Sequence, residues 1–438
     1  MKMKIDHNSV TSQVINELFH VVKDKLQGDE KLYGMFEKCF LNTLNTTVKK
    51  MEDGSTYVIT GDIPAMWLRD STCQIRPYLI LADKDEYIAN LIEGLIKRQF
   101  MYITIDPYAN AFNESNNGHC YEKDETSMGP WVWERKYEID SLCYPIQLAW
   151  LFWKATGRRA HFNEDFITGV REILKLWKLE QNHEEKSSYI FIRKNTYYKD
   201  TLSRKGKGAL VKSDIGLIWS GFRPSDDACT YGYLIPSNMF AVVVLEYLDE
   251  ILKVVIGDHK MAQEAIILRN EIYEGIETYG ITKTEEFGSV YAYETDGYGQ
   301  YNLMDDANVP SLLSMNYIGY QGKDPIVTKN TREFILSDAN PYFYKGKSAK
   351  GIGSSHTPHG YIWHISLVME GLSSTCKKDK LECLNQLKNT VDEKLLMHEG
   401  FHSDDPSQYT REWFAWANSL FAELVLDYCG LHINYDEK

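Results

Sequence analysis

The sequence lacks several features that would assign it to a common functional class. Its eight cysteines include no C-x-x-C pair, so we expect reduced thiols rather than a disulfide framework. No apolar run approaches the roughly 18 residues that a membrane span needs, so we expect no membrane partner. No Lys/Arg-rich block occurs, and 48 basic residues stand against 62 acidic ones. This balance disfavours a nucleic-acid partner.

Two further absences concern location and domain boundaries. The first residues, MKMKIDHNSVTSQ, are positively charged but lack the apolar stretch of a secretory leader, which predicts a cytoplasmic protein. No Pro/Ser/Gly-rich linker or repeat of fixed period divides the 438 residues, so we expect a single domain over 1–438. The sequence does not give an oligomeric state.

What the sequence does have is helical periodicity along most of its length. Apolar residues recur at spacings of three and four in about a dozen segments, which predicts an all-α fold. These segments are 10–26, 32–46, 71–81, 87–100, 141–153, 166–180, 238–255, 261–277, 307–318, 361–372, 381–391 and 409–428. Several connections are long, namely 101–137, 184–236, 278–306 and 392–407. Because long loops are usually functional, we expect a ring of helical hairpins whose loops gather at one end.

The clearest motif match is His398-Glu399-Gly400-Phe401-His402. In zinc hydrolases, H-E-x-x-H places two histidines on one helix face and uses the glutamate on a water. Here Gly400 interrupts the motif and Ser-Asp-Asp-Pro follows at once, which predicts an irregular loop. A zinc metallohydrolase that uses His398, Glu399 and His402 therefore stays a secondary alternative.

Paired carboxylates occur twice in loops. Asp226 and Asp227 follow Arg223, and Asp305 and Asp306 precede a predicted helix. Helix capping explains one aspartate of a pair, but not both. Adjacent carboxylates repel, and desolvation acts in the same direction, so the pKa of one member can rise far enough for a general acid. The spacing does not choose between Asp226 and Asp227.

Other loop segments combine aromatic, charged and amide side chains. In TGDIPAMWLRDST, Trp67 and Arg69 precede Asp70, which a bland interpretation makes a helix N-cap. The Gly-rich stretch around His356 lacks a P-loop ending, and no Gly-x-Ser-x-Gly occurs. The chain also has 29 Tyr and 10 Trp, whose flat faces suit sugar rings. The combination of these residues indicates a glycosidase. Carboxyl groups can act as acid and base, aromatic faces can stack on sugar rings, and an arginine can bind sugar hydroxyls.

Eight segments together resemble glycoside hydrolase family 125, the exo-acting α-1,6-mannosidases of bacteria and fungi, over positions of about 40 to 425. They are TGDIPAMWLRDST, DPYANAFN, PWVWERKYEIDSLCYP, WSGFRPSDDACTYGYLIPSNMFAV, VYAYETDGYGQYNLMDDANVPSLLS, AKGIGSSHTP, YIWHIS and MHEGFHSDDPSQYTREWFAWANSLF. The resemblance implies an (α/α)6 barrel and an inverting mechanism with an α-mannoside oligosaccharide as substrate, without a metal or other cofactor. It also implies that Asp226 is the general acid and Glu399 the general base.

Further residues are candidates for the pocket of the mannose unit that is released, the −1 sugar. They are Trp67, Arg69, Asp70, Arg223, Asp305, Asp306, Asn308, His356 and His402. The segment with Trp131 and Trp133 is a candidate border of the +1 sugar. Two other classes stay open: a helical-barrel sugar isomerase or epimerase, in which His356 and His402 carry protons, and a mannan-binding protein without activity.

Overall fold

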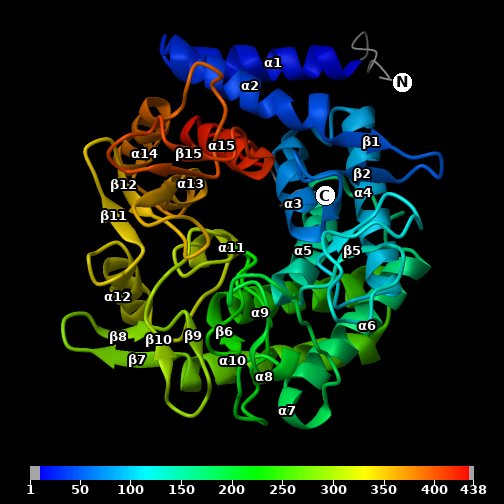
Figure 1. The fold of residues 1–438 in the computed structure, drawn as a ribbon. Coiled ribbons are helices and arrows are strands. Elements are labelled where there is room, and N and C mark those ends of the chain that lie inside the picture. The colour runs from blue at the N-terminus through cyan, green and yellow to red at the C-terminus, as the bar shows by residue number, and fades with distance from the viewer. Residues whose placement is uncertain (1–9, 434–438) are drawn as a thin grey trace.

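The computed structural model describes residues 10–433, which form a ring of helical hairpins (Figure 1). The chain passes once around the ring, from blue through green to red, and its last helix returns beside its first hairpin. This is the (α/α)6 barrel that the resemblance implies. The expectations for the first nine residues lie outside the described residues. Within the described ones, no helix has the length and apolar composition needed to cross a bilayer.

Six helices make the inner ring and are buried on nearly all sides. They are α3 (Leu68–Ile75), α5 (Ile139–Thr156), α9 (Ile235–Ile251), α11 (Met315–Ile318), α13 (His364–Leu372) and α15 (Ala415–Tyr428). Six more pack outside them, each with one exposed face. They are α2 (Glu30–Thr46), α4 (Glu86–Ile105), α6 (Glu164–Glu180), α10 (His259–Tyr279), α12 (Pro325–Ile335) and α14 (Lys377–Thr390). Helix α1 (Val10–Lys25) lies against α2 and α4.

The two rings begin their helices differently. The outer helices α2, α4, α6, α10 and α12 start at an Asp or Asn whose side chain accepts a backbone N–H of the first turn, as helix N-caps do. The inner helices α3, α5, α9, α13 and α15 have no side-chain cap. Their N-terminal ends receive the long loops, so the free N–H groups and the positive end of each helix dipole lie at the loop end of the ring.

The connections contain short antiparallel strands rather than only irregular chain. The three-stranded sheets order as β3-β4-β5, β10-β9-β6 and β13-β14-β15, and the pairs are β1-β2, β7-β8 and β11-β12. The strands are β1 (Val48–Lys50), β2 (Thr56–Val58), β3 (Met66–Trp67), β4 (Ala111–Phe112), β5 (Val132–Glu134), β6 (Tyr233–Leu234), β7 (Ile281–Thr284), β8 (Gly288–Tyr291), β9 (Glu294–Thr295), β10 (Tyr301–Asn302), β11 (Phe343–Lys345), β12 (Lys350–Ile352), β13 (Tyr361–Trp363), β14 (Gly400–His402) and β15 (Tyr409–Thr410). Strands β3, β6 and β13 each run directly into an inner helix.

The helix predicted over 307–318 is mostly wrong, because only Met315–Ile318 is helical. The carboxylate of Asp305 accepts the backbone N–H groups of Leu312 and Leu313 at 2.8 and 2.9 Å. The hydroxyl of Ser314 accepts the N–H of Ser311 at 2.8 Å. Short polar side chains that bind nearby backbone groups offer the chain an alternative to the helix. This position of the inner ring therefore holds a single helical turn after an extended segment.

Candidate active site

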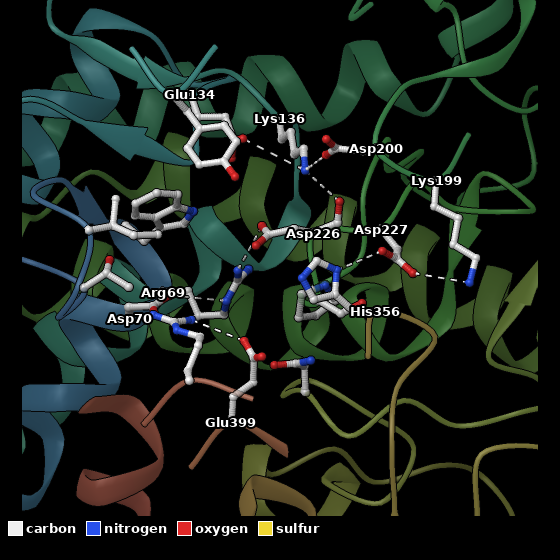
Figure 2. Close-up of a pocket in the computed structure, with 18 of the residues that line it drawn as sticks. Arg69, Asp70, Glu134, Lys136, Lys199, Asp200, Asp226, Asp227, His356 and Glu399 are labelled. Carbon is white, nitrogen blue, oxygen red and sulfur yellow. Dashed lines mark hydrogen bonds and ion pairs between the residues drawn. The ribbon is translucent and has the colours of Figure 1, made fainter. Parts of the chain in front are cut away.

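A cavity of about 810 Å³ opens at the loop end of the ring (Figure 2). Its lining comes from segments that are far apart in the sequence: 60–70, 121–136, 193–200, 224–227, 308, 355–363 and 399–416. Of the four long connections, 101–137, 184–236 and 392–407 contribute to this lining and 278–306 does not, so the prediction that the long loops meet at one end holds for three of them. The volume lies at the upper end of the range for ligand pockets, about 300–1,000 Å³, so more than one sugar ring fits.

The floor of the cavity is the junction of β3 and α3. Trp67 occupies the N-cap position with extended backbone, and Arg69 and Asp70 lie in the first helical turn. The interpretation of Asp70 as the N-cap residue is wrong, because the helix begins two residues earlier, at Leu68. The Asp70 carboxylate still gains from the N-terminal helix dipole. All three predicted residues, Trp67, Arg69 and Asp70, line the cavity and are nearly inaccessible to solvent.

Arg69 is the cation of a buried cluster of carboxylates. One terminal nitrogen donates to Glu138 at 2.8 Å and to Asp140 at 2.9 Å. The Nε atom lies 3.7 Å from Asp70, and the other terminal nitrogen lies 3.9 Å from Asp226. Burial raises the pKa of Glu138 and of Asp140, and Arg69 opposes both shifts. Burial also raises the pKa of Asp70 to about 6, again against the field of Arg69.

Asp226 sits at the end of a tight turn. The Asp226 N–H donates to the carbonyl of Arg223 at 2.9 Å, and the Arg223 N–H donates to the carbonyl of Asp227 at 2.8 Å. Pro224 takes the second position of this turn, where its fixed φ fits. Asp226 itself has φ 68°, a left-handed conformation that is uncommon outside glycine and is often found at functional sites. Its Oδ1 atom receives no hydrogen bond from the described residues.

The neighbouring Asp227 is held firmly by other groups. It accepts a hydrogen bond from the Ser355 hydroxyl and lies 3.0 Å from Nδ1 of His356, with Lys199 at 3.9 Å (Figure 2). Burial disfavours the charge of Asp227, but the bonds from His356 and Ser355 prevail and lower its pKa. Burial likewise opposes the charge of His356, yet Asp227 raises the pKa of that imidazole to about 9. The two therefore form an ion pair at neutral pH.

Glu399 enters the cavity from the C-terminal part of the chain. Its Oε1 accepts from a terminal nitrogen of Arg411 at 3.3 Å, and Arg411 also pairs with Asp62. Figure 2 shows the carboxylates of Glu399 and Asp226 on two sides of a common space, with Arg69 and Asp70 at one flank and His356 at the other. Two carboxyl groups from different loops thus face one substrate-sized space.

The H-E-x-x-H segment is not the irregular loop that the sequence predicts. Gly400–His402 is β14, paired with β13 and β15. His398 is buried, with Nδ1 2.7 Å from the carbonyl of Glu412 and its ring stacked on Tyr409 at 3.8 Å. Glu399 lines the cavity, whereas neither histidine does. Residues 10–433 contain no group of three or more His, Cys, Asp or Glu positioned to hold a metal ion, so the motif has no zinc-binding geometry.

Four residues predicted for the sugar pocket do not line the cavity: Arg223, Asp305, Asp306 and His402. The Nε of Arg223 donates to Glu294 at 2.6 Å. Asp306 accepts from the hydroxyls of Ser225 and Ser354, and Asp305 binds the backbone of 312–313. The side chains of Arg223, Asp305 and Asp306 thus bind other parts of the protein. We infer that they hold the loops in place.

The remaining predicted residues have mixed outcomes. His402 packs edge-on against Tyr361, its pairing partner on β13. Asn308 and His356 line the cavity. The candidates for the +1 border, Trp131 and Trp133, do not. Trp133 packs instead with the small cluster around Trp67.

The sequence reasoning missed two parts of the lining. The first is aromatic: Trp363, Phe414 and Trp416 join Trp67 around the cavity, and the guanidinium of Arg69 lies 5.6 Å from the Trp416 ring. Trp416 belongs to a stretch that was quoted for its resemblance, but its helical spacing is equally typical of a core residue. The side chain of Trp416 reaches the cavity because α15 packs against α3. The apolar periodicity of the sequence does not predict this contact between distant helices.

The second missed part is a charged wall. The Nζ of buried Lys136 donates to Asp200 at 2.6 Å and to the backbone carbonyl of Asp226 at 2.8 Å. Arg193 binds Asp200 and Glu134. Because Lys136 connects two loops to the turn that carries Asp226, this wall fixes the position of that turn. In the sequence, only the alternation of aromatic and charged residues in 131–140 indicated this charged wall.

Comparison with known proteins places this geometry in context. Residues 29–426 match the family model described as metal-independent α-mannosidase (GH125). The meiotically up-regulated gene 157 protein of Schizosaccharomyces pombe is 39% identical over 437 residues, which cover 95% of this chain and 86% of that protein.

Two solved structures illustrate the range of structural similarity. A metal-independent α-mannosidase of Streptococcus pneumoniae, in a non-productive complex with α-1,6-mannobiose, has a TM-score of 0.93 and 48% identity. The match covers 96% of this chain and 99% of the pneumococcal one. A bacterial glucoamylase bound to acarbose has a TM-score of 0.57 at 12% identity over 98% of this chain and 60% of its own. The second likeness shows the fold alone.

Proposed function

Because the chain belongs to glycoside hydrolase family 125, it is a metal-independent α-mannosidase, and we propose that it releases single mannose units from the non-reducing ends of α-1,6-linked mannosides. The observation that carries the proposal is the pair of carboxyl groups, Asp226 and Glu399, that face one cavity from different loops. An inverting glycosidase needs such a pair on opposite sides of the bond that it cleaves.

We assign Asp226 as the general acid. An acid has to present its proton on an oxygen that the protein leaves accessible. Oδ1 of Asp226 is buried, accepts no hydrogen bond from the described residues and lies 3.9 Å from Arg69, so the more exposed Oδ2 is the oxygen that can carry the proton. Asp227 lacks this freedom because Ser355 and His356 occupy its oxygens and its pKa is lowered. The side chain of Asp226 is also 35% exposed, against 7% for Asp227. Asp226 would therefore protonate the glycosidic oxygen as the bond breaks.

We assign Glu399 as the general base. Arg411 supports its carboxylate on one oxygen, and Nε of Arg411 in turn donates to Asp62 at 3.1 Å. This fixes Glu399 and leaves its other oxygen for a water molecule. Glu399 would take a proton from that water while the water attacks C1 of the mannose. An inverting reaction needs room for the water, which corresponds to carboxyl groups about 6.5–9.5 Å apart.

The shape of the cavity supports the release of terminal sugars. Its floor is formed by Arg69 and Asp70, which are almost inaccessible to solvent, and behind them lie the buried Glu138 and Asp140. The ion pair of Arg411 with Asp62 connects the walls at one side. A glycan therefore enters by its end rather than by an internal residue.

The α-1,6 linkage is proposed from the pneumococcal relative, which was observed with α-1,6-mannobiose. The decisive experiment incubates the protein with α-1,6-mannobiose in parallel with the α-1,2 and α-1,3 isomers and quantifies mannose. We expect rapid cleavage of the α-1,6 isomer alone. Preferred cleavage of another isomer would overturn the linkage, and intact disaccharides in all three reactions would overturn the hydrolase assignment in favour of a binding protein.

The isomerase alternative has less support. It needs His356 and His402 as proton carriers, but His402 does not line the cavity. His356 is paired with Asp227, and its pKa of about 9 keeps it charged at neutral pH. A protonated imidazole cannot act as the base that removes a proton from a sugar carbon. Interconversion of free monosaccharides would be the signature of this alternative.

A further inference from the structure

Three exposed tyrosines gather at the mouth of the cavity. Tyr197 and Tyr198 are 84% and 80% exposed, and Tyr121 is 51% exposed, yet all three belong to the cavity lining. Among the described residues, the other tyrosine of similar exposure is Tyr298, at 62%, and it does not line the cavity. Aromatic rings that remain in water on a rigid scaffold are typical of ligand-binding surfaces.

The exposure of the lining rises from the floor to the mouth. The floor residues Trp67 and Asp70 are 5% and 4% exposed, which fits a pocket that encloses one sugar completely. Asp226, which must reach the glycosidic oxygen, has a side-chain exposure of 35%. The tyrosines lie beyond it in solvent. Sugars that follow the bond being cleaved therefore leave the pocket past Asp226 and toward the tyrosines.

Cations stand against two of the three rings. The guanidinium of Arg193 lies 4.9 Å from the centre of the Tyr121 ring, and Nζ of Lys199 lies 5.8 Å from the centre of the Tyr198 ring. Arg193 is itself fixed by two bonds to Asp124, at 2.8 and 2.7 Å. Such contacts orient an aromatic ring without covering both of its faces.

The segment that carries Tyr197 and Tyr198 is anchored at its base. Asp200 binds Lys136, Arg193 and the hydroxyl of Thr196, and its N–H donates to the carbonyl of Tyr197 at 2.9 Å. The carbonyl of Lys199 accepts the N–H of Ala228 at 2.6 Å. The tyrosine segment therefore rests directly on the loop that carries Asp226.

We propose that Tyr121, Tyr197 and Tyr198 form a binding site for the sugars beyond the +1 position, on the leaving-group side of the substrate. The ligand is an α-mannoside oligosaccharide of three or more units, whose apolar ring faces stack on the tyrosines. The inference rests on the proposed function, because it takes the sugar at Trp67 as the one released. Its consequence is that the protein prefers oligosaccharides to disaccharides.

The test compares Tyr197→Ala/Tyr198→Ala with the wild type on α-1,6-mannobiose, α-1,6-mannotetraose and a dinitrophenyl mannoside. We expect kcat/KM for the tetraose to fall about tenfold, which corresponds to 1.4 kcal/mol of lost contact. Values for the disaccharide and the dinitrophenyl mannoside should change less than twofold. Tyr197→Phe/Tyr198→Phe should keep the preference for the tetraose, because the rings remain. Tyr121→Ala should weaken that preference in the same direction.

Tyr298→Ala is the matched control, since it removes an exposed ring that does not line the cavity and should leave all three substrates unaffected. Equal losses on short and long substrates, or none, would overturn the tyrosine site. Calorimetric titration of Glu399→Gln with biose and tetraose measures the same preference without turnover. A chain that hydrolyses none of the substrates contradicts the proposed function, while the titration still decides whether the tyrosines bind the longer sugar.

Discussion

Nδ1 of His356 lies 3.0 Å from Oδ1 of Asp227, whereas Asp226, the next residue along the chain, has an oxygen that no described residue hydrogen-bonds. The ion pair of Asp227 and the carboxyl of Asp226, which lies near Arg69 without a hydrogen bond to Oδ1, point to different tasks. Asp227 is held ionised by His356 and Ser355, so it orients the loop and the imidazolium. In the proposed reaction, Asp226 exchanges a proton with the substrate.

Replacement of the acid should depend on the leaving group. We expect Asp226→Asn to lower kcat/KM on α-1,6-mannobiose by about 10²–10⁴-fold, the range for loss of a general acid. The loss should be much smaller on a dinitrophenyl mannoside, whose leaving group departs as an anion. Asparagine is preferred to alanine because it tolerates the left-handed backbone at this position. Equal losses on both substrates would move the acid elsewhere, and Asp227→Asn is the control variant for that outcome.

Replacement of the base should not depend on the leaving group. Glu399→Gln keeps the shape of the side chain but cannot accept a proton from water, so both substrates should slow by about 10²–10⁴-fold. In the wild type, proton NMR from the first minutes should show β-mannose before mutarotation, as a single displacement requires. Initial α-mannose would instead indicate a covalent intermediate, with Glu399 as its nucleophile.

The His356–Asp227 pair predicts a specific pH dependence of stability. The pKa of His356 is raised from 6.5 to about 9, so the pair contributes fully below pH 6.5 and is lost as the pH rises through about 9. We compare the free energy of unfolding of the wild type with that of His356→Gln. The difference between the two should become smaller as the pH rises across that window. Because the imidazole is 40% exposed, we expect about 1 kcal/mol or less. Denaturant titrations at pH 6 and pH 10 measure it.

The other charges that face this pair are Lys199, Arg223, Asp226, Asp306 and Glu399. They are unchanged in His356→Gln, so their own titration largely cancels in the difference. A difference that stays constant to pH 10 would contradict the ion pair.

Replacement of Arg69 should lower the stability of the folded protein, whatever its effect on sugar binding. In Arg69→Leu, Glu138 and Asp140 remain buried without their cation, which costs about 3–5 kcal/mol of unfolding free energy. The deficit should shrink on going from pH 7.5 to pH 5, because these carboxyls, whose pKa burial already raises, then take up protons. Arg269→Leu, which removes a surface pair with Glu246, should change stability by less than about 1 kcal/mol.

Exhaustive chelation should leave the activity unchanged. Glu399 acts on a free water in the proposed reaction, and the two histidines of its motif do not line the cavity. A zinc enzyme would need the metal to lower the pKa of that water. Mannose release after EDTA treatment and gel filtration measures this directly. Loss of activity that Zn²⁺ restores would revive the H-E-x-x-H interpretation.

The sequence predicts the parts of the fold that depend on local pattern. The periodic segments correspond to inner and outer helices, and three of the four predicted long loops line one cavity. The helix over 307–318 fails because Asp305, Ser311 and Ser314 bind the local backbone, which apolar spacing cannot detect. Helix α12 was missed because its apolar stripe is short.

The candidate site was predictable to the extent that the residue types are unusual for a loop. Trp67, Arg69, Asp226 and Glu399 stood out for that reason, and they line the cavity. Arg223 and Asp306 stood out equally, but Arg223 donates to Glu294 and Asp306 accepts from serine hydroxyls instead of lining the cavity. Which side of a loop faces the cavity depends on contacts between distant segments, such as Lys136 with Asp226.

Helix α15 packs on α2 and α3 and so closes the ring, bringing Trp416 beside Arg69. During synthesis, the floor of the cavity emerges from the ribosome early, while Glu399, Arg411 and Trp416 follow near the end. A nascent chain thus carries the proposed acid, Asp226, without the proposed base, Glu399, and a cavity that lacks part of its wall. We therefore expect mannose release to begin only when α15 has packed into the ring. Two fragments cut between hairpins and recombined in solution should regain activity only when α15 docks, so mannose release is itself a measure of ring closure.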